Sequence, residues 1–196
     1  MRFQHRVALL TGAERDFGEV TALQLAEEGA KIALLGASSE LPEVLARKLG
    51  ETGAWSIAYE ADLTNKEEVE LAVNKIAAHW GRIDILINNA GAPHRVSILE
   101  VDEEKIHQLM DANLKSYFIC AQAVIPHMQN WRYGRIVNIA SASLLGSDLR
   151  STLYTASQAA IIGLTRSLAL EVGAFNITVN AVAPGVIEGS TLASRL

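Results

Sequence analysis

The chain has 196 residues, 49% of them hydrophobic and 20% charged, a balance typical of a globular protein with a sizeable core. A formal net charge of −5 gives no electrostatic reason to expect nucleic acid or an anionic membrane as a partner. One cysteine, Cys120, cannot form a disulfide framework or a cysteine metal site, and we expect it in the core. Without a signal-peptide pattern or an apolar run near the roughly 18 residues of a membrane span, the chain is expected to be cytoplasmic and metal-free.

Short apolar runs and longer helical patterns alternate along the chain. The runs are rich in Val, Ile or Leu and end at Gly, Asn, Asp or Ser, as expected of parallel strands covered on both faces. Five successive crossovers predict a doubly wound parallel α/β sheet, and no linker suggests a second domain within residues 1–196. The expected strands are 7–10, 31–35, 55–59, 83–87, 135–139 and 177–182, and the expected helices are about 18–28, 41–51, 66–80, 103–130 and 152–172.

The first strand runs into Thr11-Gly12 and a turn that reaches Gly18. Glycines in such a turn let the backbone approach a pyrophosphate, which then lies at the N-terminus of the next helix. Asp16 interrupts this pattern, because its carboxylate adds bulk and negative charge near a phosphate. Asp16 and Glu19 are also spaced as a capping box, so Asp16 as a helix cap stays open. Both interpretations can hold together, since a cap competes with a phosphate for the same N–H groups.

Further along the chain, the fourth strand ends in the four-residue turn Asn88-Asn89-Ala90-Gly91. The helix that follows carries Asn113 in the middle of an apolar stripe. A buried amide needs hydrogen-bond partners. Asn113 is therefore either satisfied by nearby backbone or part of a functional site.

The last strand–helix units carry a serine, a tyrosine and a glutamine. Ser141 ends the fifth strand, and Tyr154 and Gln158 lie four residues apart, on one face of the following helix. Few charges occur between residues 152 and 172, and a helix that is apolar on nearly all sides is covered on nearly all sides. The sheet covers one face, and a second subunit would cover the other, which predicts a homodimer or homotetramer.

These motifs together resemble the short-chain dehydrogenase/reductase family, and its bacterial 3-oxoacyl-carrier-protein reductase-like members in particular. The resemblance extends over essentially the whole chain. It implies a Rossmann fold of three αβα layers with strand order 3-2-1-4-5-6. Members of the family continue into a substrate-covering helix, one more helix and a seventh strand, so we expect that strand to be missing. The implied reaction is hydride transfer between a nicotinamide cofactor and a small alcohol or ketone.

The resemblance also assigns roles to matching residues. Ser141, Tyr154 and Asn113 correspond to the family's catalytic residues, with Asn113 acting through its backbone carbonyl. Asp62 with Leu63 corresponds to an adenine-contacting pair, although Asp62 as a cap of the next helix stays open. The full cofactor-binding set would be Gly12, Arg15, Gly18, Asp62, Leu63, Asn89, Ala90, Gly91, Tyr154, Gln158, Pro184 and Gly185.

Cofactor preference depends on two positions. Gly36 stands where an acidic residue would hold the ribose 2′-hydroxyl of NAD. This absence, together with Arg15 in the glycine turn, favours NADP over NAD. Arg15 as an ordinary surface arginine stays open.

Two departures from the family bear on the chemistry, besides Asp16. Gln158 stands where the family has a lysine, and Gly189 where it has a threonine. Free tyrosine has a pKa near 10, and a neighbouring ammonium can lower such a value by roughly 1–3 units. Gln158 carries no charge, although its amide can still bond a ribose hydroxyl.

Two functions of different classes therefore compete. The first is an NADP-linked oxidoreductase with weakened acid–base chemistry, supported by Ser141, Tyr154, Asn113 and the Asn-Asn-Ala-Gly turn. The second is an inactive relative that acts as a binding or oligomerisation module. The departures at Asp16, Gln158 and Gly189 favour the second.

Overall fold

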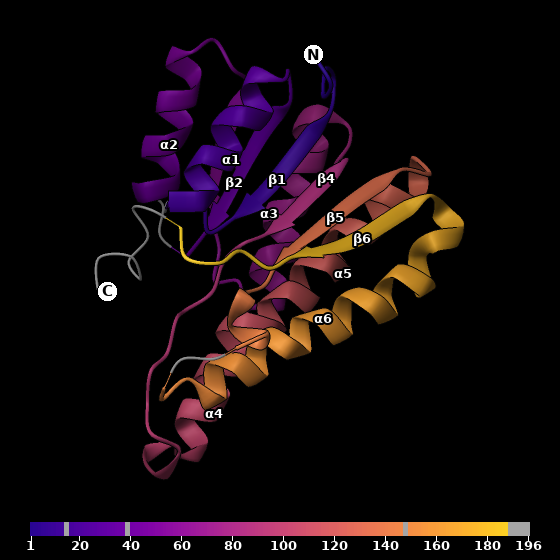
Figure 1. Ribbon diagram of the computed structural model, residues 1–196. Helices are drawn as coiled ribbons and strands as arrows, with labels where there is room; N and C mark the ends of the chain where they lie inside the picture. The colour runs from indigo at the N-terminus through magenta and orange to yellow at the C-terminus, as the bar shows by residue number, and fades with distance from the viewer. Residues whose placement is uncertain (14–15, 38–39, 147–148, 188–196) are drawn as a thin grey trace.

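The computed structural model describes residues 1–13, 16–37, 40–146 and 149–187 (Figure 1). Within these residues, six strands form one parallel sheet in the order β3-β2-β1-β4-β5-β6. The predicted fold class and strand order are therefore confirmed. The strands are β1 (Val7–Thr11), β2 (Lys31–Gly36), β3 (Ser56–Glu60), β4 (Ile85–Asn88), β5 (Gly134–Ile139) and β6 (Ile177–Val182).

Helices cover both faces of this sheet and complete a three-layer arrangement. Helices α1 and α2 pack on one face, and α3, α5 and α6 pack on the other (Figure 1). Each of the strands β1 to β5 is followed by a helix that returns the chain to the amino ends of the strands, as right-handed crossovers require. The helices are α1 (Asp16–Glu27), α2 (Glu40–Glu51), α3 (Lys66–Trp80), α4 (Glu103–Met110), α5 (Ser116–Asn130) and α6 (Thr152–Val172).

The strand sequences explain why the sheet is covered twice. Side chains of a strand alternate between the two faces, and all five residues of β1 are buried. Leu9 packs into the cluster under α3, α5 and α6, whereas Leu10 packs into the cluster under α1 and α2. Continuous apolar runs of this kind are what a parallel sheet between two helical layers needs.

The helical stretch expected over 103–130 is confirmed in extent but is not one regular helix. Residues Asp111–Lys115 form a π-helical turn between α4 and α5. Such turns insert an extra residue into the helix and are frequent at functional sites. Asn113 lies at the centre of the turn and is 1% exposed.

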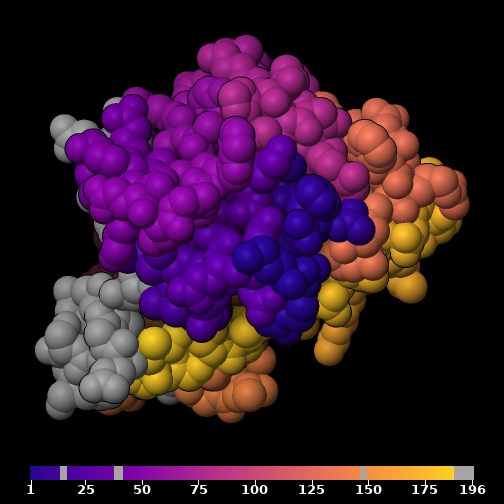
Figure 2. All heavy atoms as spheres, turned by 90° about the horizontal axis from the view of Figure 1, so that it is seen from above, coloured from indigo at the N-terminus to yellow at the C-terminus, as the bar shows by residue number. Residues whose placement is uncertain are grey.

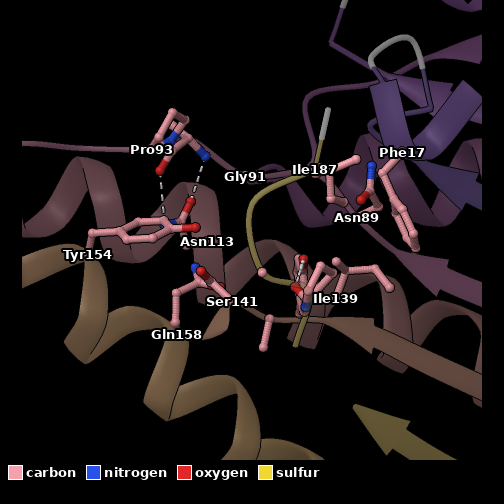
Figure 3. Close-up of a pocket in the computed structure, with 16 residues that line it drawn as sticks. Phe17, Asn89, Gly91, Pro93, Asn113, Ile139, Ser141, Tyr154, Gln158 and Ile187 are labelled. Atoms are coloured by element: carbon pink, nitrogen blue, oxygen red, sulfur yellow. Dashed lines mark hydrogen bonds between the residues drawn. The ribbon is translucent and has the colours of Figure 1, made fainter. Parts of the chain in front are cut away.

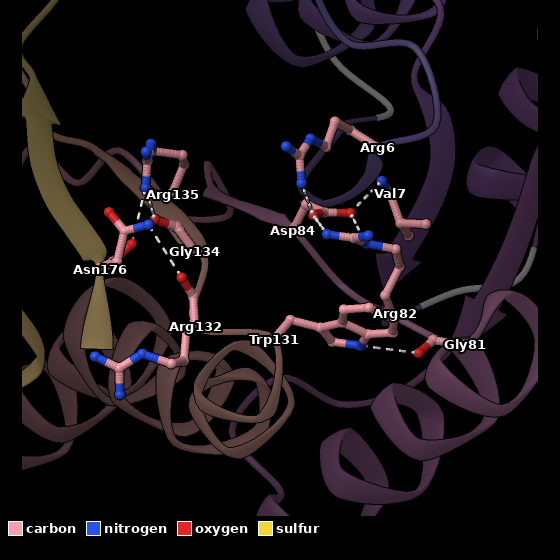
Figure 4. A network of polar contacts seen from close by, with 10 residues as sticks. All are labelled: Arg6, Val7, Gly81, Arg82, Asp84, Trp131, Arg132, Gly134, Arg135 and Asn176. Carbon is pink, nitrogen blue, oxygen red and sulfur yellow. Dashed lines mark hydrogen bonds and ion pairs between the residues drawn. The ribbon is translucent and has the colours of Figure 1, made fainter.

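The amino ends of the strands are joined by one buried carboxylate. Asp84 has a fully buried side chain and accepts hydrogen bonds from Arg6 (2.8 Å), from the Val7 N–H (3.0 Å) and from Arg82 Nε (2.8 Å) (Figure 4). The Arg82 guanidinium lies 4.5 Å from the centre of the Trp131 ring. These contacts connect β1, β4 and the segment before β5.

Within the described part of the chain, no helix is both long enough and apolar enough to cross a membrane.

Candidate active site

The turn after β1 and the turn after β4 are held against each other by hydrogen bonds. Thr11 Oγ1 accepts from the N–H groups of Asn89 (3.1 Å) and Ala90 (3.2 Å). Asn89 Nδ2 donates to the Gly12 carbonyl (2.7 Å). Gly12 has a φ of 60°, and a Cβ there would lie 2.7 Å from Ala90 Cα. The position therefore requires glycine because of both the backbone angle and the close approach.

Gly18 completes the close packing of the glycine turn at the start of α1. A Cβ at this position would lie 2.5 Å from the Gly12 carbonyl oxygen and 2.9 Å from Asn89 Nδ2. Arg15 and the side chain of Asp16 lie outside the described residues, so their predicted roles stay predictions. Glu19, the expected capping partner of Asp16, forms an ion pair with Lys48 of α2.

A cavity of about 230 Å³ opens at the carboxyl ends of β4, β5 and β6 (Figure 3). It brings together the predicted catalytic residues and most of the predicted cofactor-binding residues. None of the described residues that line it carries a charged side chain. The lining comprises Phe17, Asn89, Ala90, Gly91, Ala92, Pro93, Asn113, Tyr117, Ile139, Ala140, Ser141, Tyr154, Gln158, Pro184, Gly185 and Ile187.

Ser141 follows β5 and caps a short 3₁₀ turn, Ala142–Leu144. Its Oγ accepts a hydrogen bond from the Ser143 N–H (3.2 Å). The hydroxyl hydrogen stays available to a ligand, because this bond uses only a lone pair. The Ala142 N–H donates to the Pro184 carbonyl (2.9 Å), which fixes the Pro184-Gly185 turn beside Ser141.

Tyr154 lies in the first turn of α6 and lines the same cavity. Within the described residues its hydroxyl has no hydrogen-bond partner, whereas its carbonyl accepts from Ser157 Oγ (2.7 Å). Figure 3 shows Tyr154, Asn113 and Gln158 on one side of the cavity and Phe17, Asn89 and Ile187 on the other. Ser141 and Tyr154 thus line a common space, and the hydroxyl hydrogen of each stays available to a ligand.

Tyr117 is a lining residue to which the sequence reasoning gave no role at the site. Its hydroxyl donates to the Ile139 carbonyl (2.8 Å), and its side chain is almost fully buried. Burial raises the pKa of Tyr117 far above its usual range, and the nearby Tyr154 raises it further. Tyr117 is therefore a neutral wall residue, and its position in the apolar stripe of the long helix was the only sequence signal.

Both the oxygen and the nitrogen of the Asn113 side-chain amide form hydrogen bonds. Its Oδ1 accepts from the Ala92 N–H (2.7 Å), and its Nδ2 donates to the Ala92 carbonyl (3.2 Å) and to Ser157 Oγ (3.0 Å). The partners are a distant loop and the start of α6, so neither is local backbone. The role assigned to the Asn113 backbone carbonyl stays a prediction.

Gln158 is 5% exposed and lies in the wall of the cavity, one helical turn after Tyr154. Its Nε2 has one long contact, to Ser157 Oγ at 3.5 Å, and its Oε1 has no partner within the described residues. The amide therefore keeps one donor hydrogen and one acceptor oxygen for a ligand hydroxyl.

Asp62 and Leu63 do not belong to this cavity. An Asp62 side-chain oxygen accepts from the Thr64 N–H (2.8 Å) and hydroxyl (2.8 Å), while Asn65 caps α3 through bonds to the N–H groups of Glu67 and Glu68. The alternative that Asp62 caps the helix is therefore wrong, because Asn65 occupies that position. Leu63 is 8% exposed and packs in the core. Their contact with an adenine stays a prediction.

The cavity fits one end of a dinucleotide in position and chemistry. Open doubly wound sheets bind nucleotides outside the carboxyl ends of their strands, near the reversal of strand order, here between β1 and β4. A volume of about 230 Å³ is below the about 300–1,000 Å³ of pockets for whole drug-sized ligands. This volume suits one end of a dinucleotide rather than the whole molecule, and Asn89, Tyr154 and Gln158 lie in the wall. Fold and site together define a dinucleotide-binding protein of the oxidoreductase class.

Comparison with known proteins agrees with this class. The sequence model described as short chain dehydrogenase matches residues 6–196. The chain is 40% identical over 188 residues to "(2S)-[(R)-hydroxy(phenyl)methyl]succinyl-CoA dehydrogenase subunit BbsD" of Thauera aromatica, covering 96% of this chain and 75% of the relative. It is 36% identical over 188 residues to the 3-oxoacyl-[acyl-carrier-protein] reductase FabG of Thermotoga maritima, covering 96% and 76%.

Among solved structures, that of NAD⁺-bound xylitol dehydrogenase superposes with a TM-score of 0.95 at 34% identity, covering 100% of this chain and 75% of that one. The chain belongs to the short-chain dehydrogenase family. Membership implies a nicotinamide cofactor and a small-molecule substrate.

Proposed function

We propose that this chain is an NADP(H)-dependent oxidoreductase of alcohols and ketones, with 3-oxoacyl thioesters as the first substrates to test. The observation that carries the proposal is the convergence of Ser141, Tyr154, Asn113 and Gln158 on one uncharged cavity. Gly36 at the end of β2 supports NADP over NAD, since no carboxylate stands there to hold a 2′-hydroxyl. The 3-oxoacyl-[acyl-carrier-protein] reductases among the relatives motivate the choice of substrate.

In the direction of reduction, two hydroxyls act on the carbonyl oxygen of the substrate. A reduced nicotinamide held by Asn89, Tyr154 and Gln158 would supply the hydride for the carbonyl carbon. Tyr154 donates its phenolic proton to the oxygen, so that the carbonyl becomes an alcohol and a phenolate remains. Ser141 donates a hydrogen bond to the same oxygen and stabilises its developing negative charge.

Gln158 limits this chemistry. An ammonium one helical turn from Tyr154 would stabilise the phenolate by charge, whereas the Gln158 amide can offer only a hydrogen bond. Ligand positioning survives because Nε2 and Oε1 can still bond ribose hydroxyls. We therefore expect cofactor binding with slow turnover.

A second candidate function, a non-catalytic binding or oligomerisation module, is favoured by a cavity on the outer side of α5 and α6. The cavity measures about 430 Å³, and Phe118 in its wall is 44% exposed. A second copy of this chain that covers α5 and α6 would bury this apolar surface. Light scattering at micromolar concentration tests the assembly, and a monomer would contradict it.

A fluorescence titration with NADPH separates the two functions. The oxidoreductase predicts saturable NADPH binding and slow, measurable oxidation of NADPH in the presence of a 3-oxoacyl thioester. The module predicts assembly without nicotinamide binding. Tyr154→Phe serves as the control, because it must abolish turnover while leaving the protein folded.

A further inference from the structure

Ser157 lies behind the candidate active site, out of reach of any ligand. It is 0% exposed and lines no part of the cavity, although the next residue, Gln158, does. Its Oγ donates to the Tyr154 carbonyl (2.7 Å) and accepts from Asn113 Nδ2 (3.0 Å) and, at longer range, from Gln158 Nε2 (3.5 Å). A serine hydroxyl has one hydrogen and two lone pairs, so this set uses its full capacity.

Asn113 extends the connection to a third segment. Its amide pairs with both the N–H and the carbonyl of Ala92, in the loop after β4. A Cβ on the preceding residue, Gly91, would lie only 3.1 Å from Asn113 Oδ1, so the loop is also held close to the amide. The loop after β4, the π-helical turn and the first turns of α6 are thereby joined through two buried side chains.

We propose that Ser157 is a positioning residue: its hydroxyl sets the place of the Tyr154 turn and of the Gln158 amide relative to the loop at Gly91 and Ala92. The proposal rests on the proposed function only where cofactor binding is the readout. Replacing Ser157 by alanine leaves one Asn113 N–H without its partner in a buried place. The Asn113 amide and the first turns of α6 are then no longer joined by hydrogen bonds through Ser157. We expect the side chains of Tyr154 and Gln158 to shift relative to the loop at Gly91 and Ala92.

The same helix offers a matched control away from the cavity. Thr165 Oγ1 donates to the Ile161 carbonyl (2.8 Å) and accepts from Asn138 Nδ2 (3.0 Å). As at Ser157, an amide donates to a hydroxyl, which in turn donates to a helix carbonyl. Thr165 is also buried, at 7% exposed. Thr165 does not line the active-site cavity, and neither do its two partners. Loss of its hydroxyl therefore reproduces the structural cost without the positioning effect.

The experiment compares Ser157→Ala, Ser157→Thr and Thr165→Val in urea unfolding and in NADPH fluorescence titration. We expect Ser157→Ala to weaken NADPH binding by about fivefold or more, because Tyr154 and Gln158 both lie on the turn that loses its anchor. Ser157→Thr keeps the hydroxyl and is expected to bind within about twofold of the wild type. Thr165→Val, at a comparable loss of stability, is expected to leave the dissociation constant within about twofold.

A nuclear magnetic resonance measurement tests the same link without any ligand. In ¹H–¹⁵N spectra, Ser157→Ala should shift the Asn113 side-chain amide and the backbone amides of Gly91 and Ala92, whereas Thr165→Val should leave them in place. Unchanged signals in Ser157→Ala, or equal losses of NADPH affinity in Ser157→Ala and Thr165→Val, would overturn the proposal. Absence of nicotinamide binding in the wild type would instead overturn the proposed function, and the spectra would still decide the role of Ser157.

Discussion

The carboxyl ends and the amino ends of the strands, called the carboxyl edge and the amino edge of the sheet below, accommodate buried polar groups in different ways. At the carboxyl edge, the candidate site is built from amides, hydroxyls and backbone, and none of its described lining residues is charged. At the amino edge, the buried Asp84 is compensated by Arg6 and Arg82, and arginines lie over aromatic rings (Figure 4). Figure 2 is a view onto the amino edge. The first residues of the chain, in indigo, lie there beside the segments that precede β5 and β6.

We expect the charged groups at the amino edge to contribute to stability, and the uncharged groups at the carboxyl edge to contribute to the chemistry. Loss of one member of a buried ion pair strongly destabilises a protein, because the charge of the other member is left uncompensated. Such an arrangement suits the edge that holds β1, β4 and β5 together. A neutral cavity costs less to desolvate and leaves its hydroxyls free, but it has no charge with which to stabilise a phenolate. Changes of charge at the two edges should therefore affect different properties.

The largest expected effect is on stability, from Asp84→Asn. The substitution keeps the size of the side chain but leaves the Arg6 and Arg82 guanidinium groups without their buried counter-charge. We expect the free energy of unfolding, measured by urea denaturation, to fall by roughly 3–5 kcal/mol. NADPH affinity of the folded fraction should not change, because the cavity lies at the opposite edge.

Glu70→Gln is the control for the loss of a carboxylate. Its partner Lys66 and Glu70 itself are both about half exposed, and the two lie 3.7 Å apart on the surface of α3. An exposed pair of this kind contributes about 0.3–0.5 kcal/mol. If Asp84→Asn lowers the free energy of unfolding no more than Glu70→Gln does, the buried ion pairs of Asp84 do not stabilise the amino edge.

Placing a charge at the neutral edge should change activity instead. Gln158→Lys puts an ammonium one helical turn from Tyr154, where it stabilises the phenolate. We expect turnover of a 3-oxoacyl thioester to rise roughly ten- to a thousandfold, and the alkaline rise in alcohol oxidation to move to lower pH. Steady-state kinetics with NADPH, measured from pH 6 to about 10, check both effects.

Gln158→Met is the matched control, since it removes the amide without adding charge. Tyr154→Phe in the lysine background must abolish the gain if the lysine works through the phenol. A lysine variant that binds NADPH and reduces no ketone would show that Gln158 is not what limits the chemistry. The oxidoreductase proposal would then fail.

Short-range patterns in the sequence predicted the strands, and they marked most of the residues that the structure brings together at the cavity. Apolar runs and their end residues placed all six strands to within two residues, and the Asn89-Ala90-Gly91 turn lies where expected. The π-helical turn at Asn113 was not predictable, because it depends on contacts with Ala92 and Ser157, 21 and 44 residues away. The role of Ser157 was hidden for the same reason, since a small polar residue in a helix gives no local signal.

The long-range contacts of Asp84 were equally hidden. A single aspartate before a strand predicts a turn or a cap as readily as a buried ion pair. Arg82 is only two residues from Asp84, but Arg6 is 78 residues away, and only the sheet order brings β1 beside β4. What the sequence could not supply was therefore the pairing of polar groups across elements.

A third prediction concerns alkaline pH, where buried neutral acids matter. Burial raises the pKa of the Cys120 thiol to about 12, from an ordinary value of 9.0. Between these values the unfolded chain has released the proton and the folded chain has kept it, so stability falls as pH rises. From pH 9 to 11 this thiol alone should lower the free energy of unfolding by about 2 kcal/mol.

Urea denaturation at several pH values checks the alkaline prediction, with Cys120→Ala as the comparison. The variant should show a shallower loss of stability above pH 9, whatever its stability at neutral pH. Tyr117, whose pKa is also raised by burial, remains in the variant and keeps part of the slope. Equal slopes in both proteins would show that the thiol is accessible to solvent in the folded state.

The smallest expected effect returns to the amino edge and to Trp131. The residue is 54% exposed, its ring lies under the Arg82 guanidinium, and its Nε1 donates to the Gly81 carbonyl (3.2 Å). Trp131→Phe keeps an aromatic face and should cost about 0.5–1 kcal/mol of unfolding free energy through the lost hydrogen bond. Trp131→Leu also removes the cation–π contact and should cost about 0.5–1 kcal/mol more. If the two variants are equally stable, the cation–π contact between the ring and Arg82 adds nothing to stability. The stabilisation of Arg82 would then come from Asp84 alone.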